Sequence, residues 1–176
     1  ASDLDYVILR YFNVAGADPQ TRLGQATPEA THLIKVACEC ATGAREGMQI
    51  FGTDYGTRDG TCIRDYIHVE DLASAHVRAL EHMREGNGSE VLNCGYGRGF
   101  TVREVIDVVK RLSGVDIPVT EAERRAGDPE ALMADNQMIR RRLDWTPAYD
   151  DLDTIVQTAL DWERHWQARR KNLTDH

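Results

Sequence analysis

Arginines on and beside a predicted strand are the side chains in this sequence best suited to binding chemistry. Arg64 lies in the middle of the alternating segment 62–69, and Arg58 lies in the glycine-bearing loop before it. A guanidinium matches the oxygens of a phosphate or diphosphate because it can donate two parallel hydrogen bonds. A structural use is open as well, since Arg64 has acidic neighbours in Asp65 and Glu70 and surface ion pairs are common.

A second polar cluster lies further along, in R-R-A-G-D-P at 124–129. Arg125 and Asp128 are close enough in sequence to form an ion pair within their own loop. Asn13 ends an apolar segment, where an amide side chain can turn back onto its own backbone.

Strands and helices that alternate along the chain must position these side chains, and this order predicts an α/β fold. The apolar run 6–14 is typical of a strand buried on both faces of a parallel sheet. Such a strand needs a neighbouring strand on each side, and residues 1–5 offer none. Because the chain also starts without Met, we expect an upstream portion of the protein outside this chain. Further strands are predicted at 48–51, 62–69, 91–94 and 117–120, and helices at 29–42, 70–84 and 102–112, after Asp135 and after Asp150 or Asp151.

Two of these helices carry clear local signals. Thr101 and Glu104 form the pattern of a capping box before the helix 102–112, and Gly114 is a plausible stop. The helix 70–84 has a stripe at helical spacing that we expect to face inward. The residues of this stripe are Leu72, Ala73, His76, Val77, Leu80 and Met83.

Three glycines after the strand 91–94 imitate a dinucleotide-binding loop. Gly95, Gly97 and Gly99 are spaced G-x-G-x-G, whereas the fingerprint requires G-x-G-x-x-G and an acidic residue about 20 positions later at the end of a second strand. We therefore interpret this segment as a tight turn.

The composition excludes several classes of protein. The 176 residues suffice for one globular domain, and a net charge of −8 argues against a nucleic-acid partner. No apolar run approaches the roughly 20 residues that span a bilayer, so we expect no membrane insertion and a cytoplasmic location. The cysteines are too few and too scattered for a disulfide framework, and we expect buried thiols and no metal site. They are Cys38, Cys40, Cys62 and Cys94.

Four motifs stand in a familiar order: R-Y-F-N-V-A-G-A at 10–17, the block 51–72, N-C-G-Y-G-R-G-F-T-V-R-E-V-I at 93–106, and R-R-A-G-D-P at 124–129. Together they resemble the C-terminal half of the UDP-glucose 4-epimerase family, within the extended short-chain dehydrogenases/reductases. The resemblance implies a Rossmann-type protein of which this chain holds the smaller substrate-binding domain and the late strands of the sheet. Accordingly, we expect a UDP-sugar-binding portion at 1–168 and a polar tail at 169–176, without the NAD-binding N-terminal domain.

The resemblance also implies an activity, the interconversion of UDP-glucose and UDP-galactose through a 4-keto intermediate with bound NAD. In the family, a Tyr-x-x-x-Lys pair and a nearby Ser or Thr transfer the proton. None of the six tyrosines here is followed by Lys four positions on. We therefore assign no catalytic residue and expect this chain alone to be inactive and not to bind NAD. The alternatives are another nucleotide-sugar epimerase or dehydratase of the family, or a non-catalytic UDP-sugar-binding fragment.

The matching positions imply the contacts to a UDP-sugar. Arg64 and Arg125 match two guanidiniums on the pyrophosphate, and Asp128 matches a carboxylate on the ribose hydroxyls. Tyr11 and Phe12 match positions on the nicotinamide side. The remaining substrate positions are Asn13, His32 and Leu33, and Gln49, Ile50 and Phe51 on the strand that matches the uracil contact; other members carry Asn in place of His32.

Leu132 stands at a position that varies with the sugar in the family. Members restricted to glucose and galactose often carry a bulky Tyr there, and members that accept N-acetylated sugars carry a small residue. Leucine is intermediate in size, so the resemblance leaves acceptance of the larger sugars open.

The absent domain has a physical consequence for the chain alone. The segments 6–14 and 91–94 should present unpaired strand edges and apolar faces where a Rossmann domain would pack. Self-association through that surface is therefore expected.

Overall fold

Pairing around one strand in the middle of the chain organises the fold. The computed structural model describes residues 4–174. The central strand β4 (Ile63–His68) pairs with parallel β2 (Asn13–Ala15), antiparallel β6 (Gly99–Thr101) and parallel β8 (Ala131–Leu132). Two parallel pairs stand outside this sheet: β1 (Val7–Tyr11) with β5 (Glu90–Cys94), and β3 (Met48–Phe51) with β7 (Val119–Ala122). The predicted α/β class is confirmed.

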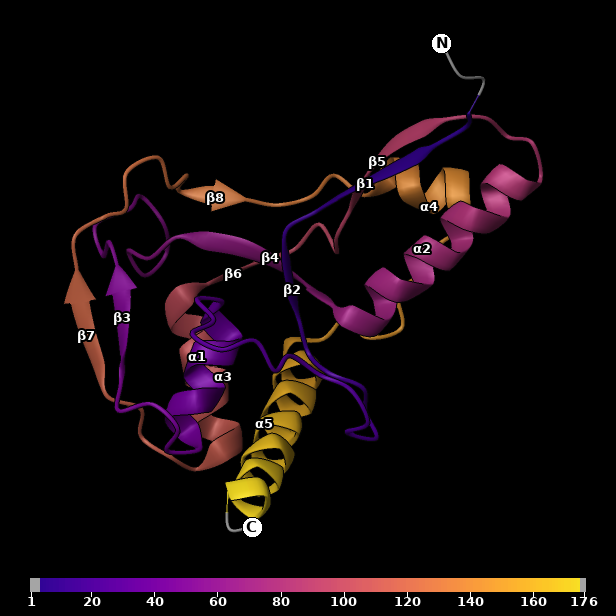
Figure 1. Cartoon of the computed structure of the whole chain (residues 1–176). Helices are drawn as coiled ribbons and strands as arrows, with labels where there is room; N and C mark the ends of the chain where they lie inside the picture. The colour runs from indigo at the N-terminus through magenta and orange to yellow at the C-terminus, as the bar shows by residue number, and fades with distance from the viewer. Residues whose placement is uncertain (1–3, 175–176) are drawn as a thin grey trace.

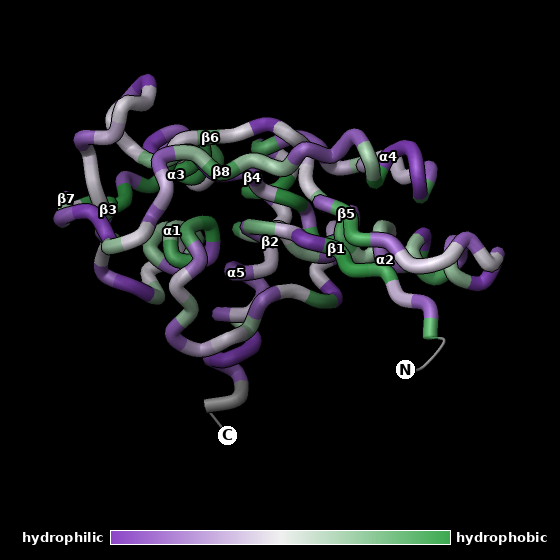
Figure 2. Tube along the Cα trace, turned by 90° about the horizontal axis from the view of Figure 1, so that it is seen from above, coloured by the Kyte–Doolittle hydropathy of each residue, from purple (hydrophilic) through white to green (hydrophobic). Residues whose placement is uncertain are grey.

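The helices fall into two groups on either side of β4 (Figure 1). One group packs together beneath the central sheet and consists of α1 (Leu33–Ala41), α3 (Val102–Ser113) and α5 (Leu152–Thr174). The other lies beside β1 and β5 and consists of α2 (Val69–Arg84) and α4 (Gln137–Leu143). Seen from above, hydrophobic segments gather in α1 and along the paired strands β1 and β5 (Figure 2). Within residues 4–174, no helix is both long and apolar enough to cross a membrane.

Several local predictions are confirmed. The Thr101 side chain accepts a hydrogen bond from the Glu104 backbone and the Glu104 carboxylate accepts one from the Thr101 backbone, and α3 ends at Gly114 with a left-handed φ of 72°. The glycine segment after β5 is a turn that leads into β6, not into a helix. All four cysteines are buried.

The prediction of one strand at 6–14 is wrong. The chain breaks at Phe12 into β1 and β2, which join different sheets. The unpaired edge expected for this segment is present, because within the described residues β1 pairs only with β5, and its apolar side chains Ile8 and Tyr11 are 48% and 47% exposed. Hydrophobicity alone cannot reveal where an apolar run changes sheet.

Some predicted boundaries also shift. The first helix begins at Leu33, not at residue 29, because Glu29 adopts a left-handed φ of 52° that no helix accommodates. The strand expected at 117–120 is β7, which starts at Val119. Asp135 accepts a hydrogen bond from the Gln137 backbone, but the N-cap of α4 is the residue after it. The segment 169–176, expected as a polar tail, is helical through Thr174, and its last two residues lie outside the described part.

The inward stripe predicted for α2 is also wrong, since the helix is rotated. Of the predicted residues only Leu72 is buried, whereas Val77 and Leu80 are 54% and 57% exposed. The cause is the buried carboxylate of Asp71, which accepts hydrogen bonds from the hydroxyl of Tyr96 and from backbone groups of the 148–149 segment. This anchor turns the face of Asp71 inward, together with two alanines and a histidine: Ala75, Ala79 and His82.

His68, at the junction of β4 and α2, holds three parts of the chain together. Its Nδ1 accepts a hydrogen bond from the Glu70 backbone at 3.1 Å, and its Nε2 lies 3.0 Å from the hydroxyl of Thr158 on α5. The ring stacks on Tyr149 with centroids 4.4 Å apart. The left-handed turn at Gly16 lies so close that an added Cβ would stand 2.5 Å from the imidazole. His68 is therefore buried as a neutral ring.

This burial predicts a loss of stability in mild acid. Burial is the main cause that lowers the pKa of His68, while the charge of Asp71 opposes it. The unfolded chain then binds the proton more readily, so the stabilisation is complete above the ordinary histidine pKa of about 6.5 and decreases as pH falls below it. We expect the free energy of unfolding in urea to fall between about pH 7 and pH 5.

The variant His68→Gln should show a flatter pH profile than the unmodified chain. The matched control is His76→Gln on the exposed side of α2, which should leave the slope unchanged. Equal slopes for the unmodified chain and His68→Gln would contradict the prediction.

Candidate nucleotide-sugar site

A cleft of about 550 Å³ opens between the start of α1, β3, β4 and the loop 124–128. This volume falls in the ordinary range of small-molecule sites. Eight of the ten predicted substrate positions line it: Asn13, His32, Leu33, Gln49, Phe51, Arg64, Arg125 and Asp128. The two predicted diphosphate arginines, which lie far apart in the sequence, thus share one cleft. No three His, Cys, Asp or Glu side chains of the described part are arranged to hold a metal ion.

Arg64 is held firmly on β4. Its Nη2 donates to Oδ1 of Asp128 at 2.8 Å and its Nη1 donates to the carbonyl of Ile63 at 2.7 Å. The side chain is 11% exposed, whereas that of Asp128 is 32% exposed. The structural alternative of a pair with Asp65 is not formed, because the Asp65 carboxylate instead accepts backbone hydrogen bonds around the glycine turn. Arg64 is therefore preorganised and aimed at the loop of Asp128.

Arg125 lies differently from Arg64. Its guanidinium stacks over the ring of Phe51, 3.8 Å from the centroid, and it forms no ion pair within residues 4–174. The local ion pair with Asp128 that the loop sequence allowed is not formed, and only the backbones bond, from the Asp128 N–H to the Arg125 carbonyl at 3.2 Å. Of the two predicted diphosphate arginines, Arg64 is therefore paired with a carboxylate and Arg125 is not.

The side chains of β3, the strand that matches the uracil contact, point alternately into the cleft and into the core. Gln49 and Phe51 line the cleft, while the side chain of Ile50 is 2% exposed and belongs to the core. Because neighbouring side chains of a strand point to opposite faces, only the backbone of Ile50 is available to a ligand in the cleft.

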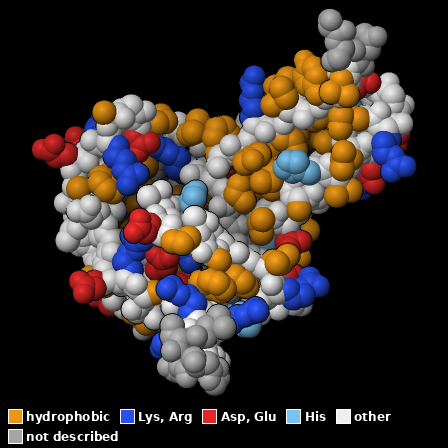
Figure 3. Space-filling view, in the orientation of Figure 1, with side chains coloured by type: hydrophobic (Ala, Val, Ile, Leu, Met, Phe, Trp, Pro, Cys, Tyr) orange, Lys and Arg blue, Asp and Glu red, His pale blue; other side chains and the backbone are white. Residues whose placement is uncertain are grey.

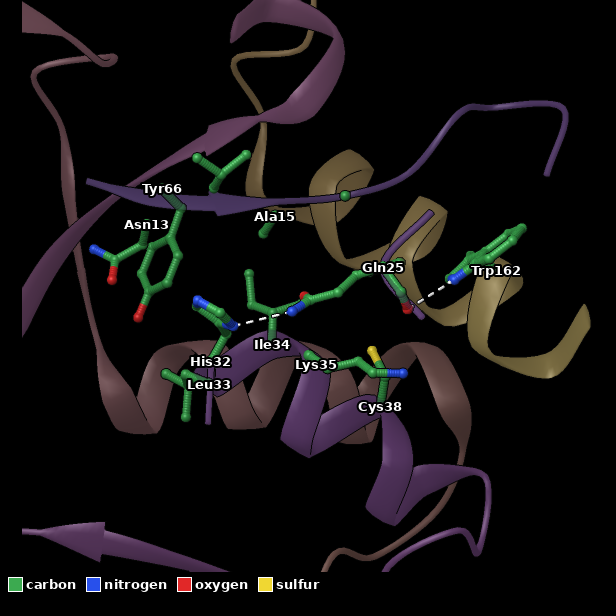
Figure 4. Close-up of a pocket in the computed structure, with 13 residues that line it drawn as sticks. Asn13, Ala15, Gln25, His32, Leu33, Ile34, Lys35, Cys38, Tyr66 and Trp162 are labelled. Atoms are coloured by element: carbon green, nitrogen blue, oxygen red, sulfur yellow. Dashed lines mark hydrogen bonds between the residues drawn. The ribbon is translucent and has the colours of Figure 1, made fainter. Parts of the chain in front are cut away.

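The start of α1 forms the opposite wall. His32 is the N-cap of α1 and its side chain makes no capping hydrogen bond. The Asn13 amide donates to the carbonyl of Asp65 at 3.0 Å. Behind these residues lies a small cavity of about 30 Å³ that Asn13, His32, Leu33 and Tyr66 also line (Figure 4). Unbonded N–H groups at a helix start favour anions, so this wall suits a diphosphate.

Besides Ile50, three predicted positions lie outside the lining of the cleft. Tyr11 ends β1, where it packs edge-on against His76 with centroids 6.3 Å apart. Phe12 is half-buried between β1 and β2. Leu132 pairs with Arg64 across β8 and β4 and is 36% exposed.

The sequence argument missed lining residues that the strand period could have revealed. Cys62, Arg64 and Tyr66 alternate and all line the cleft. Burial raises the pKa of both the Cys62 thiol and the Tyr66 hydroxyl, while the charge of Arg64 lowers both in part. No comparable signal marked Arg45, which reaches the cleft and pairs with Glu39 at 2.9 Å.

Comparison with known proteins gives consistent matches. A model of the NAD dependent epimerase/dehydratase family matches residues 1–95. The UDP-glucose 4-epimerase of Azospirillum brasilense is 62% identical over 164 residues, which are 93% of this chain and 47% of that protein. The crystal structure of UDP-glucose 4-epimerase from Brucella ovis in complex with NAD is 48% identical, with a TM-score of 0.88 over 92% of this chain and 50% of that one. The UDP-Glc/GlcNAc 4-epimerase of Campylobacter jejuni is 56% identical, with a TM-score of 0.76 over 92% and 49%.

The fold is therefore that of the C-terminal part of a Rossmann-type α/β enzyme. The chain belongs to the NAD dependent epimerase/dehydratase family, and the resemblance to the C-terminal half of UDP-glucose 4-epimerases is confirmed. It spans about half the length of the curated relatives it matches.

Proposed function

We propose that this chain is the UDP-sugar-binding part of an NAD-dependent UDP-glucose 4-epimerase. The observation that carries the proposal is the single cleft shared by Arg64, Arg125 and Phe51. Two guanidiniums beside an aromatic ring suit a diphosphate next to a flat base. The names of the relatives, UDP-glucose 4-epimerases, support the same ligand.

The contacts within the cleft suggest how a UDP-sugar would be received. In the free cleft Asp128 accepts from Arg64. A diphosphate would take the guanidinium of Arg64, and the carboxylate of Asp128 would then be available to ribose hydroxyls. Gln49 and Phe51 would hold the base, and Arg125 would move from the Phe51 ring onto the phosphates. Such anchoring remote from the sugar retains the intermediate while the sugar ring turns.

We propose that the residues of this chain do not make an NAD site by themselves. Tyr11 is at the exposed end of β1, and the glycine turn 95–99 is tied back to Asp65. NAD is a cofactor of the family and supplies the hydride chemistry when bound. We propose that the NAD-binding half and the Tyr-x-x-x-Lys pair are supplied by a longer, cytoplasmic protein, and that this chain alone turns over no UDP-glucose.

Calorimetry with UDP tests the proposed ligand. We expect measurable binding to this chain without added NAD, with the heat lost when Asp128 and Arg125 are both replaced by alanine. An absence of binding at millimolar UDP would overturn the proposal.

Product analysis distinguishes the activities that the family allows. When the N-terminal half of the Azospirillum enzyme is supplied, an epimerase yields UDP-galactose from UDP-glucose, whereas a dehydratase or decarboxylase of the family does not.

Leu132 provides a prediction about the sugar. We propose that it borders the sugar end of the site, as its pairing with Arg64 suggests. With the N-terminal half supplied, Leu132→Tyr should lower the turnover of UDP-N-acetylglucosamine relative to UDP-glucose by about tenfold, since steric differences of this kind change rate ratios by roughly 10 to 200. Exposed Met138 on α4 provides the control Met138→Tyr, which should leave the ratio unchanged. An unchanged ratio in Leu132→Tyr would remove this residue from the sugar site.

An apolar surface marks where we propose the missing half docks. Its residues are Tyr6, Ile8 and Tyr11 near β1, Val91 on β5, and Val77 and Leu80 on α2, each at least 44% exposed (Figure 3). Patches of this kind in a soluble chain mark interaction surfaces. Without a partner on this apolar surface, the chain should self-associate through it.

Light scattering tests the self-association. The unmodified chain should show a mass above that of the monomer, and the double variant Leu80→Glu with Val77→Glu should be monomeric. A monomeric unmodified chain would contradict the prediction.

A further inference from the structure

Gln25, which has no role in the proposed site, touches a residue that does. Its side-chain amide nitrogen lies 3.0 Å from Nδ1 of His32. The backbone carbonyl of Gln25 accepts a hydrogen bond from the indole of Trp162 on α5, also at 3.0 Å. Figure 4 shows both contacts beside the small cavity. The loop is thus fixed through its backbone to the helix core, and the side chain is left to hold the imidazole.

This contact decides what His32 offers to the cleft. With the amide nitrogen facing the ring, as it does here, the amide donates and Nδ1 accepts, which corresponds to the tautomer with its proton on Nε2. Nε2 points away from Gln25, toward the side where Asn13 and Tyr66 lie (Figure 4). His32 lines the cleft as well as the small cavity. The neutral ring therefore presents a donor, whereas the opposite tautomer would present a lone pair, which repels anionic oxygens.

We propose that Gln25 is a positioning residue that holds His32 as the Nε2–H tautomer, so that the imidazole donates a hydrogen bond to an oxygen of the sugar diphosphate. His32 then serves as a hydrogen-bond donor of fixed orientation, comparable to an amide. The identity of the ligand rests on the proposed function; the control of the tautomer does not.

The tautomer can be read directly from long-range proton–nitrogen correlation spectra of the ¹⁵N-labelled chain. At about pH 8.5 an ordinary imidazole is neutral. The His32 signals are assigned by their loss in His32→Asn. We expect shifts of a pure Nε2–H ring in the unmodified chain, shifts averaged between both tautomers in Gln25→Leu, and a protonated Nδ1 in Gln25→Glu, because a carboxylate can only accept. Identical His32 shifts in all three proteins would overturn the inference.

UDP calorimetry at about 0.15 M salt measures the consequence. We expect Gln25→Glu to weaken UDP binding about tenfold, and Gln25→Leu to weaken it about threefold. Gln20→Glu is the matched control, because it places the same charge on an exposed side chain of the same loop. In a His32→Leu background, Gln25→Leu should have no further effect and Gln25→Glu no more than Gln20→Glu. Full effects in that background would overturn the inference.

The two proposals fail separately. UDP binding by the unmodified chain, with His32 shifts that do not respond to residue 25, would overturn the role of Gln25 alone. An absence of UDP binding would overturn the proposed function, while the spectra would still decide whether Gln25 sets the tautomer.

Discussion

Replacing Arg64 by alanine is expected to weaken UDP binding to this chain by about 100-fold, because hydrogen bonds to charged groups contribute roughly 1.5–3 kcal/mol. The loss has two causes. First, the diphosphate loses a donor that the structure holds in place. Second, Asp128, which pairs with Arg64 in the unmodified chain, is left in the cleft as an anion without a counter-charge. Isothermal titration with UDP measures the change.

Two further variants isolate these causes. Arg58→Ala removes an arginine from the loop before β4 that pairs with Glu104 outside the cleft, so it should bind UDP as the unmodified chain does. The double variant Arg64→Ala with Asp128→Asn should recover part of the affinity, because the repulsion is relieved. An Arg64→Ala chain that binds UDP within threefold of the unmodified chain would refute the assignment of Arg64 to the diphosphate.

The second large effect concerns stability. Lys35 on α1 and Glu163 on α5 form an ion pair in the core, with side chains 8% and 1% exposed. Glu163 also accepts from Gln167 at 2.6 Å, and Lys35 lies 3.3 Å from Glu39. Removing one member of a buried pair typically costs 3–5 kcal/mol because the other charge is left without compensation. Since Glu39 remains beside Lys35, we expect Glu163→Ala to lower the free energy of unfolding by about 3 kcal/mol in urea titrations.

An exposed ion pair that involves the same helix provides the control. Asp153 on α5 pairs with Arg111 at 2.6 Å, with side chains 48% and 56% exposed, and Asp153→Ala should cost less than about 1 kcal/mol. The apolar double variant Lys35→Met with Glu163→Leu should be close to the unmodified chain, since it leaves no buried charge. A cost for Glu163→Ala no larger than that for Asp153→Ala would show that burial of the pair does not matter.

Local signals predicted most of the elements. The capping box at Thr101 and the stop at Gly114 depend only on contacts within a few residues, and the structure has both. The stripe on α2 failed because its rotation is set by Asp71, whose hydrogen-bond partners lie at Tyr96 and in the 148–149 segment. No periodicity within a helix contains that information.

The candidate site also has features that the sequence predicts and features that depend on tertiary contacts. Types and order of residues were enough to select Arg64, Arg125 and Asp128, and the period of a strand would have added Tyr66. Which cation is neutralised could not be predicted. The loop sequence allowed an ion pair between Arg125 and Asp128, yet Asp128 pairs with Arg64, because the loop folds back over β4 and brings residues 64 positions apart within 2.8 Å.

The sequence by itself determined the α/β class, the membership suggested by four ordered motifs, and the set of charged side chains available for a diphosphate. Only the tertiary structure decided that these side chains share one cleft, that Ile50 faces the core while its neighbours on β3 face the cleft, and that Gln25 reaches His32. The physical reason is the distance along the chain between the groups that interact. Caps, turns and periodicities are fixed by neighbours along the chain, whereas ion pairing and the rotation of a helix are fixed by whichever distant segment packs against them.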